Sequence, residues 1–191
     1  PSIINHDDKN ALEEALKLKD GYKDVEITVL TMGPPQADVA LREALAMGAD
    51  RAVLVSDRAF AGADTWATSN TLTAAIKKIG DFDIIFCGRQ AIDGDTAQVG
   101  PQVAEKLNLP QITYVKQLEI NGDTVVAQRA LEDGYEVLSV KMPCLLTAIK
   151  ELNSPRYPGV KGIFEAYREK TVDMMSAADL EIDPAIIGLN G

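Results

Sequence analysis

The sequence predicts an α/β protein: a Rossmann-like, mostly parallel sheet with helices on both faces, and antiparallel hairpins in the C-terminal third. Short β-branched runs alternate with amphipathic segments of helical length up to residue 115, which is typical of a covered parallel sheet. Two turn signals, at 121–123 and 133–134, then separate alternating runs as hairpin loops do. The 191 residues, 46% of them hydrophobic, are enough for a domain with a substantial core.

The expected elements follow in a regular order. Asp7 or Asp8 caps the first helix, Gly48 ends the second, and Asp64 caps the third. Helices are expected at 8–19, 36–47, 65–79, 102–107 and 163–170. Strands are expected at 25–29, 51–55, 82–86, 111–115, 124–129, 135–140 and 144–149. We divide the chain into a nucleotide-binding α/β core (1–115), antiparallel strands of the same domain (116–152), and a tail that is mostly loop (153–191).

The composition excludes several classes of protein. The net charge of −10, from 19 Lys and Arg against 29 Asp and Glu, disfavours nucleic-acid binding because such a surface repels phosphate backbones. No apolar run is long enough to span a bilayer, and no signal peptide is visible. Cys87, Cys144 and a single His do not make a disulfide framework or a zinc site. A reducing compartment is therefore expected.

The segment 87–101 is the most informative part of the chain. It follows an apolar run expected to be a strand and precedes a helix, so backbone N–H groups and the positive end of the helix dipole favour a phosphate there. The alternative is a turn with an Asp or Thr N-cap. The G-x-G-x-x-G and P-loop patterns are absent. Because ligands bind at the carboxyl ends of parallel strands, we expect loops 31–36, 56–64 and 88–100 to converge.

The charged residues of this loop allow more than one interpretation. Asp93 and Asp95 are best explained as turn formers and as anions near a helix N-terminus, since no His or third carboxylate lies nearby. Arg89 either balances a phosphate or pairs with an aspartate. We predict no catalytic residue and no metal ligand.

The stretch Arg89–Gly100 resembles the adenine-nucleotide loop of electron-transfer flavoprotein beta subunits. Segments 44–51 and 152–157 also resemble that family, and the similarity runs in order along essentially the whole chain. Family members begin before Pro1 and continue beyond Gly191, so we expect a chain truncated at both ends. We further expect these residues alone to aggregate or to lack ligand, because the missing first strand would neighbour the nucleotide.

The resemblance also implies cofactor contacts. Thr96 and the backbone N–H groups of 97–100 would hold phosphates, while Asn5, Asp8 and Met32 match positions near the adenosine. Asp8 and Met32 stand where some members carry cysteine. The loop 57–65 looks like that of the electron-bifurcating branch, whose beta subunit carries a complete FAD; the alternative is AMP. The implied contacts are Asn5, Asp8, Met32, Asp57, Phe60, Ala61, Asp64, Thr65, Arg89, Gly94, Asp95, Thr96, Ala97, Gln98, Val99 and Gly100.

Partners follow from the same resemblance. Residues 154–163 are similar to a recognition loop that docks on a dehydrogenase, with Pro155, Arg156, Tyr157 and Val160 as docking residues; the alternative is a rigid Pro-rich linker. In the bifurcating branch NADH reduces the beta-subunit FAD. Electrons then pass to ferredoxin or flavodoxin and, through the FAD of an alpha subunit, to an acyl-CoA dehydrogenase.

Two other functions stay open at this point: a simple carrier subunit that holds structural AMP, and an ATP-binding sensor domain of similar fold. We expect a cytoplasmic protein, or a mitochondrial matrix protein if the source is eukaryotic. Neither a nucleic-acid partner nor membrane insertion is expected.

Overall fold

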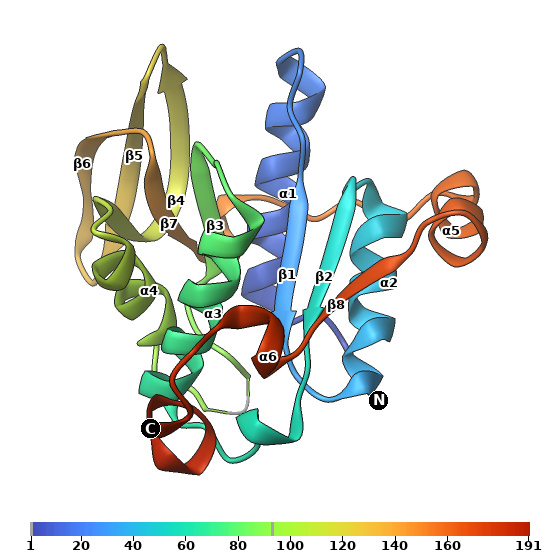
Figure 1. Cartoon of the computed structure of the whole chain (residues 1–191). Coiled ribbons are helices and arrows are strands. Elements are labelled where there is room, and N and C mark those ends of the chain that lie inside the picture. Colours follow the sequence, from blue (N-terminus) through green and yellow to red (C-terminus); the bar gives the residue numbers. More distant parts are fainter. Residues whose placement is uncertain (1, 93) are drawn as a thin grey trace. The chain divides into compact units, whose positions relative to one another are not determined.

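The computed structural model describes residues 2–92 and 94–191, so Asp93 lies outside the described residues. The chain divides into two compact units, each with its own sheet (Figure 1). Unit 1 contains residues 2–4, 15–80 and 156–191, and unit 2 contains residues 5–14 and 81–155. The parallel strands, helices and antiparallel hairpins confirm the mixed α/β class that the sequence predicts.

Unit 1 is built on a three-stranded parallel sheet. Its strands, in spatial order, are β1 (Thr28–Met32), β2 (Arg51–Val55) and β8 (Val172–Met175). The central strand β2 is buried from Ala52 to Val55, as expected for an apolar run covered on both faces. Helices α2 (Asp38–Met47) and α3 (Thr65–Ile79) pack on this sheet.

The predicted ends of these two helices are confirmed. The carboxylate of Asp64 accepts a hydrogen bond from the amide of Ala67 at 2.9 Å and so caps α3. Gly48 ends α2 with a φ of 130°, a conformation that side chains rarely adopt.

The C-terminal tail has more regular structure than the sequence predicts. The expected helix at 163–170 is α5 (Val160–Arg168), which packs on α2, and a short helix α6 (Ala177–Leu180) starts with a capping box. Between them lies β8, which pairs in parallel with β2. The sequence Val-Asp-Met-Met has no clear alternation, so this strand is revealed only by its partner.

Unit 2 is built on a five-stranded sheet in which the first three strands are parallel and the last two antiparallel. In spatial order the strands are β3 (Ile84–Gly88), β7 (Cys144–Ala148), β4 (Gln111–Asn121), β5 (Thr124–Leu131) and β6 (Gly134–Lys141). Both predicted hairpins are present, with pairing of Asn121 to Thr124 and of Leu131 to Gly134. Helix α4 (Val99–Leu107) packs against β7 and β4.

Helix α1 (His6–Gly21) contributes residues 6–14 to unit 2 and residues 15–21 to unit 1. Three of its four predicted apolar residues, Ala11, Leu12 and Leu16, are buried. The parallel strands therefore occupy two sheets, where the sequence predicts one. The loops that follow β1 and β2 belong to unit 1, and the loop that follows β3 belongs to unit 2.

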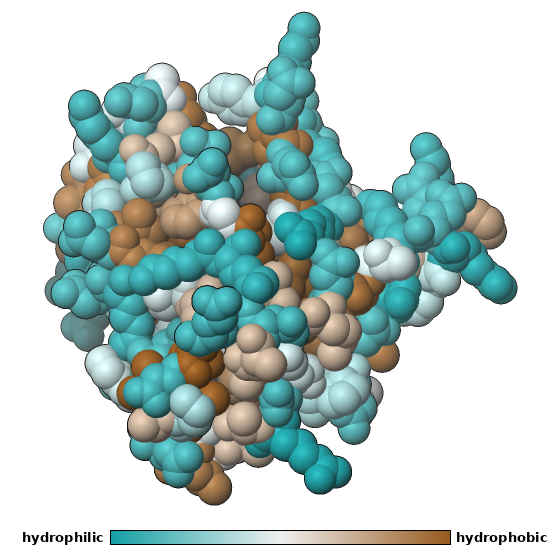
Figure 2. Space-filling model, viewed as in Figure 1, coloured by the Kyte–Doolittle hydropathy of each residue, from teal (hydrophilic) through white to brown (hydrophobic). Residues whose placement is uncertain are grey.

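Hydrophilic side chains cover most of the molecular face seen in Figure 2. Among the described residues, no helix combines the length and the apolar composition that crossing a bilayer requires. Within the same ranges, no three His, Cys, Asp or Glu side chains gather into a possible metal site.

Candidate functional site

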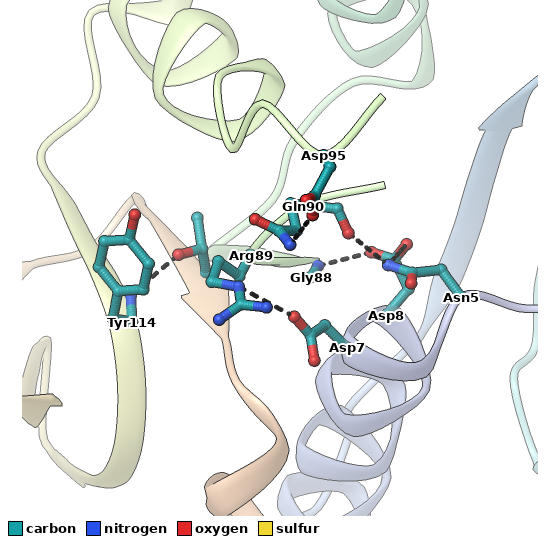
Figure 3. Close-up of polar contacts among 9 residues, drawn as sticks. Asn5, Asp7, Asp8, Gly88, Arg89, Gln90, Asp95 and Tyr114 are labelled. Atoms are coloured by element: carbon teal, nitrogen blue, oxygen red, sulfur yellow. Dashed lines mark hydrogen bonds and ion pairs between the residues drawn. The ribbon is translucent and has the colours of Figure 1, made fainter. Parts of the chain in front are cut away.

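The carboxyl end of β3 meets the first turn of α1. A Cβ atom on Gly88 would lie 2.6 Å from the backbone nitrogen of Asp8 and 2.8 Å from the carbonyl carbon of Asp7. Only glycine allows this approach, because backbone atoms cannot rotate away as a flexible side chain does. The Gly88 amide donates a 2.5 Å hydrogen bond to the Asp8 carboxylate (Figure 3). Strand and helix are thus joined where the informative loop begins.

Asn5 ties the same helix start to the loop. Its side-chain amide donates to the carbonyl of Gln90 at 2.7 Å and to the Asp8 carboxylate at 3.0 Å. The Gln90 side chain in turn donates to the carboxylate of Asp95 (Figure 3). These contacts bring Asn5, Asp8 and Asp95, which are 90 residues apart at the extremes, into one cluster within unit 2.

The charged groups of this cluster are the carboxylates of Asp7, Asp8 and Asp95 and the guanidinium of Arg89. Burial raises the pKa of Asp8, while hydrogen bonds from Asn5 and Gly88 oppose the shift and the nearby Asp7 adds to it. Arg89 forms a 3.4 Å ion pair with Asp7, which is the second of the two alternatives for this residue. The pair joins the buried Arg89 Nε to Asp7 Oδ2 without meeting the geometry of a hydrogen bond, so this N–H already faces a carboxylate.

The loop leads into α4 without a side-chain cap. Gln98 occupies the N-cap position and makes no capping hydrogen bond through its side chain. The expected alternative of an Asp or Thr cap is therefore wrong. Helix α4 begins at Val99, too far along the chain for Asp95 or Thr96 to occupy its N-cap position. Asp95 and Ala97 have φ values of 51° and 53°, which cost free energy in residues other than glycine. Left-handed residues beside helical ones orient successive N–H groups toward an anion.

Gly100 has a role that the sequence did not reveal. A Cβ atom there would lie 2.9 Å from the Cys87 sulfur on β3 and 2.9 Å from the Thr147 methyl group on β7. This glycine lets helix and sheet pack closely, so a bulky substitution disturbs packing before it obstructs a ligand. Both cysteines are free thiols, and burial raises their pKa, that of Cys144 to about 11.

The loop between β2 and α3 uses its side chains mainly within unit 1. The Asp57 carboxylate accepts from the amides of Ala59 at 3.0 Å and Ala177 at 3.1 Å, and these bonds lower its pKa. Phe60 is a core residue, only 5% exposed. Ala61, one of the cofactor contacts that the family resemblance implies, is exposed.

The predicted cofactor residues are distributed over both units. Unit 2 holds Asn5, Asp8, Arg89, Gly94, Asp95, Thr96, Ala97, Gln98, Val99 and Gly100; unit 1 holds Met32, Asp57, Phe60, Ala61, Asp64 and Thr65. Met32 packs against the apolar core of unit 1, and Thr65 is the first residue of α3. The sequence did not indicate Asp7, Gly88 and Gln90 as individual residues of the site. Glycine at the end of a predicted strand was a usable signal for Gly88.

The predicted docking residues lie around the start of α5. The Arg156 guanidinium pairs with Asp20 at 2.7 Å, whereas the side chains of Tyr157 and Val160 are 94% and 87% exposed. Val160 is the first residue of α5, so part of the expected loop is helical. A Cβ atom on Gly162 would lie 2.2 Å from the Ala46 carbonyl oxygen, which fixes α5 closely on α2.

The amino-acid sequence matches one family of known proteins along nearly the whole chain. An electron transfer flavoprotein domain matches residues 1–180. The chain is 63% identical, over its whole length and 73% of the relative, to the electron transfer flavoprotein subunit beta of Thermoanaerobacterium thermosaccharolyticum. It is 56% identical, over its whole length and 72% of the relative, to the caffeyl-CoA reductase–Etf complex subunit CarD of Acetobacterium woodii. Identity to the acryloyl-CoA reductase electron transfer subunit gamma of Anaerotignum propionicum is 52%, covering the whole chain and 73% of the relative.

Proposed function

The chain belongs to the electron transfer flavoprotein family as a beta-type, electron-transfer subunit, and we propose that it carries electrons through a bound FAD. We further propose NADH as the donor, with ferredoxin or flavodoxin and an acyl-CoA dehydrogenase as acceptors. A complete heterodimer with an alpha subunit that carries a second FAD would perform this reaction. Because the curated relatives are bacterial, we propose a cytoplasmic location.

The observation that carries the nucleotide proposal is the polar cluster at the end of β3. The cluster offers a start of α4 without a side-chain cap, two left-handed residues before it, and the guanidinium of Arg89, whose side chain is 40% exposed. Oriented backbone amides and a guanidinium are the groups that bind phosphate. The residues present therefore fit the diphosphate of FAD or the phosphate of AMP.

A bound FAD would supply the one- and two-electron chemistry, and the side chains would place it. Asn5 and Asp8 hold the loop at the end of β3, and Arg89 would balance phosphate charge. The small, exposed residue Ala61 would let the flat flavin ring approach the backbone. No side chain of this chain needs to act as acid, base or nucleophile.

The names of the relatives support the proposed acceptor. CarD belongs to a caffeyl-CoA reductase–Etf complex, and another relative is an electron transfer subunit of acryloyl-CoA reductase. Both named reductases act on unsaturated acyl-CoA thioesters. The exposed side chains of Tyr157 and Val160 offer an apolar contact of the kind that transient interfaces use.

The first test is the nucleotide content and NADH response of the purified heterodimer. We expect two FAD per heterodimer and bleaching of one flavin on NADH titration. Recovery of one FAD and one AMP, with no flavin reduced by NADH, would refute the bifurcating assignment and leave the AMP-holding carrier.

The second test concerns the phosphate contacts. Thr96→Val removes a hydroxyl at the proposed site while keeping the shape of the side chain, so nucleotide retention after gel filtration should fall. Thr171→Val, an exposed residue outside every proposed site, is the matched control. Equal retention in both variants would contradict the placement of phosphate at Thr96.

A further inference from the structure

Asn153 stands immediately before the docking segment, which we define as residues 154–163, and is joined to α1 by reciprocal hydrogen bonds. Its side-chain amide donates to the Asn10 carbonyl at 2.9 Å and to the Glu14 carboxylate at 2.8 Å. The Asn10 amide donates back to the carbonyl of Asn153 at 2.7 Å and to its side-chain oxygen at 3.0 Å. All these contacts lie within unit 2.

The groups of this contact are shielded from water. Asn10 is 4% exposed and Glu14 is 8% exposed, so a lost hydrogen bond would leave buried polar atoms without solvent to replace it. An amide supplies two donors and an acceptor, and aspartate at the same position supplies no donor. Asn153→Asp would also place a second carboxylate beside Glu14, where like charges repel.

The position of Asn153 in the chain gives this contact a consequence beyond stability. Residues 153–159 have no regular secondary structure, and the Asn153 backbone is fully extended, with φ −166° and ψ 177°. A segment of this kind is positioned by the contacts at its ends. Asn153 holds the first end to α1, and the pair between Arg156 and Asp20 follows three residues later.

We propose that Asn153 is a positioning residue for partner docking. Its side-chain amide holds the start of the docking segment in place before a partner binds. Less conformational entropy is then lost when an acyl-CoA dehydrogenase binds. The inference rests on the docking role proposed above, and it assigns to Asn153 the task of ordering the segment rather than of touching the partner.

The test uses the complete heterodimer with the acyl-CoA dehydrogenase as electron acceptor. Asn153→Asp should raise the KM for the dehydrogenase about tenfold, as expected for losing a hydrogen bond to a charged group. The kcat and the NADH-driven reduction of an artificial dye should stay within about twofold of wild type. Hydrogen exchange at residues 154–159 should be faster. Adding Glu14→Gln, whose amide donates to the new carboxylate, should recover part of the KM.

Controls separate positioning from folding. Val125→Ala removes a fully buried core side chain elsewhere in unit 2 and should lower the melting temperature without changing KM. Asn153→Ala, which adds no charge, replaces Asn153→Asp if the latter does not fold. An unchanged KM in the Asn153 variants overturns the inference, as does a KM that simply tracks melting temperature across the Asn153 and Val125 variants. A wild-type heterodimer that passes no electrons to the dehydrogenase refutes the proposed function itself, and the inference with it.

Discussion

Gly88→Ala should separate the end of β3 from the first turn of α1 and so disrupt the nucleotide site. The added methyl group would lie 2.6 Å from the Asp8 nitrogen, 2.8 Å from the Asp7 carbonyl carbon and 2.9 Å from the Asp7 Cβ. Two of these three atoms belong to the backbone, so the whole helix start must move. The hydrogen bond from the residue 88 amide to the Asp8 carboxylate, 2.5 Å long in the structure, would lengthen with it.

The size of the effect follows from these two losses. Overpacking a tight contact costs about 1–3 kcal/mol, and a hydrogen bond to a charged group contributes about 1.5–3 kcal/mol. The same displacement of α1 causes the overpacking cost and the loss of the hydrogen bond, so the two free energies do not add fully. We expect the free energy of unfolding to fall by about 3 kcal/mol in total. For a chain of this length the melting temperature should fall by roughly 6–12 °C.

The assay combines thermal unfolding with hydrogen exchange of the β3 amides, because a chain with two compact units need not unfold in one step. Nucleotide content is measured on the same heterodimer preparations. Gly21→Ala is the control, since a Cβ atom at Gly21 meets nothing within 4 Å. If Gly88→Ala matched wild type in melting temperature and nucleotide content, the close approach of strand and helix would not be the reason for this glycine.

Three further predictions concern other contacts. Gly100→Ala should lower the free energy of unfolding by about 1–3 kcal/mol, and Thr147→Ser should restore part of it by removing the facing methyl group, as measured by denaturant titration. Gly162→Ala, whose Cβ would lie 2.2 Å from the Ala46 oxygen, should detach α5 from α2 and speed hydrogen exchange in α5. Partial burial would raise the pKa of Asp50, but hydrogen bonds, chiefly from Lys19, outweigh it and lower the pKa. Its stabilising contribution is therefore complete above the unfolded value of about 4 and is lost as the pH falls through the lower folded value. A melting temperature of Asp50→Asn that differs from wild type as much at pH 2 as at pH 7 would contradict this.

Local signals in the sequence determined the elements whose ends depend on near neighbours. The strand at 51–55 and the helix at 65–79 were predicted with the bounds that the structure shows. An apolar run defines the first, and the Asp64 cap and a following Gly80 define the second. Both hairpins were predictable for the same reason, because a two-residue turn joins strands that are adjacent in the chain.

The division into two sheets and the strand β8 were decided by tertiary structure. A four-residue strand with no clear alternation forms because β2 supplies its hydrogen-bond partners, and that pairing is not encoded within the segment. The left-handed backbone of Tyr114, inside β4, accompanies a shift in the register of β4 against β7. The Tyr114 amide there donates a hydrogen bond to the Thr147 hydroxyl oxygen.

The candidate site shows the same separation of local and long-range information. The sequence by itself determined that a polar loop follows a strand, opens a helix and carries Arg89 and Thr96, since residues close in the chain fix that arrangement. Only the tertiary structure joined Asp8 to Gly88, 80 residues away, and Asn10 to Asn153, 143 residues away. Such contacts depend on the packing of whole elements, and the residues on either side of each partner contain no sign of it.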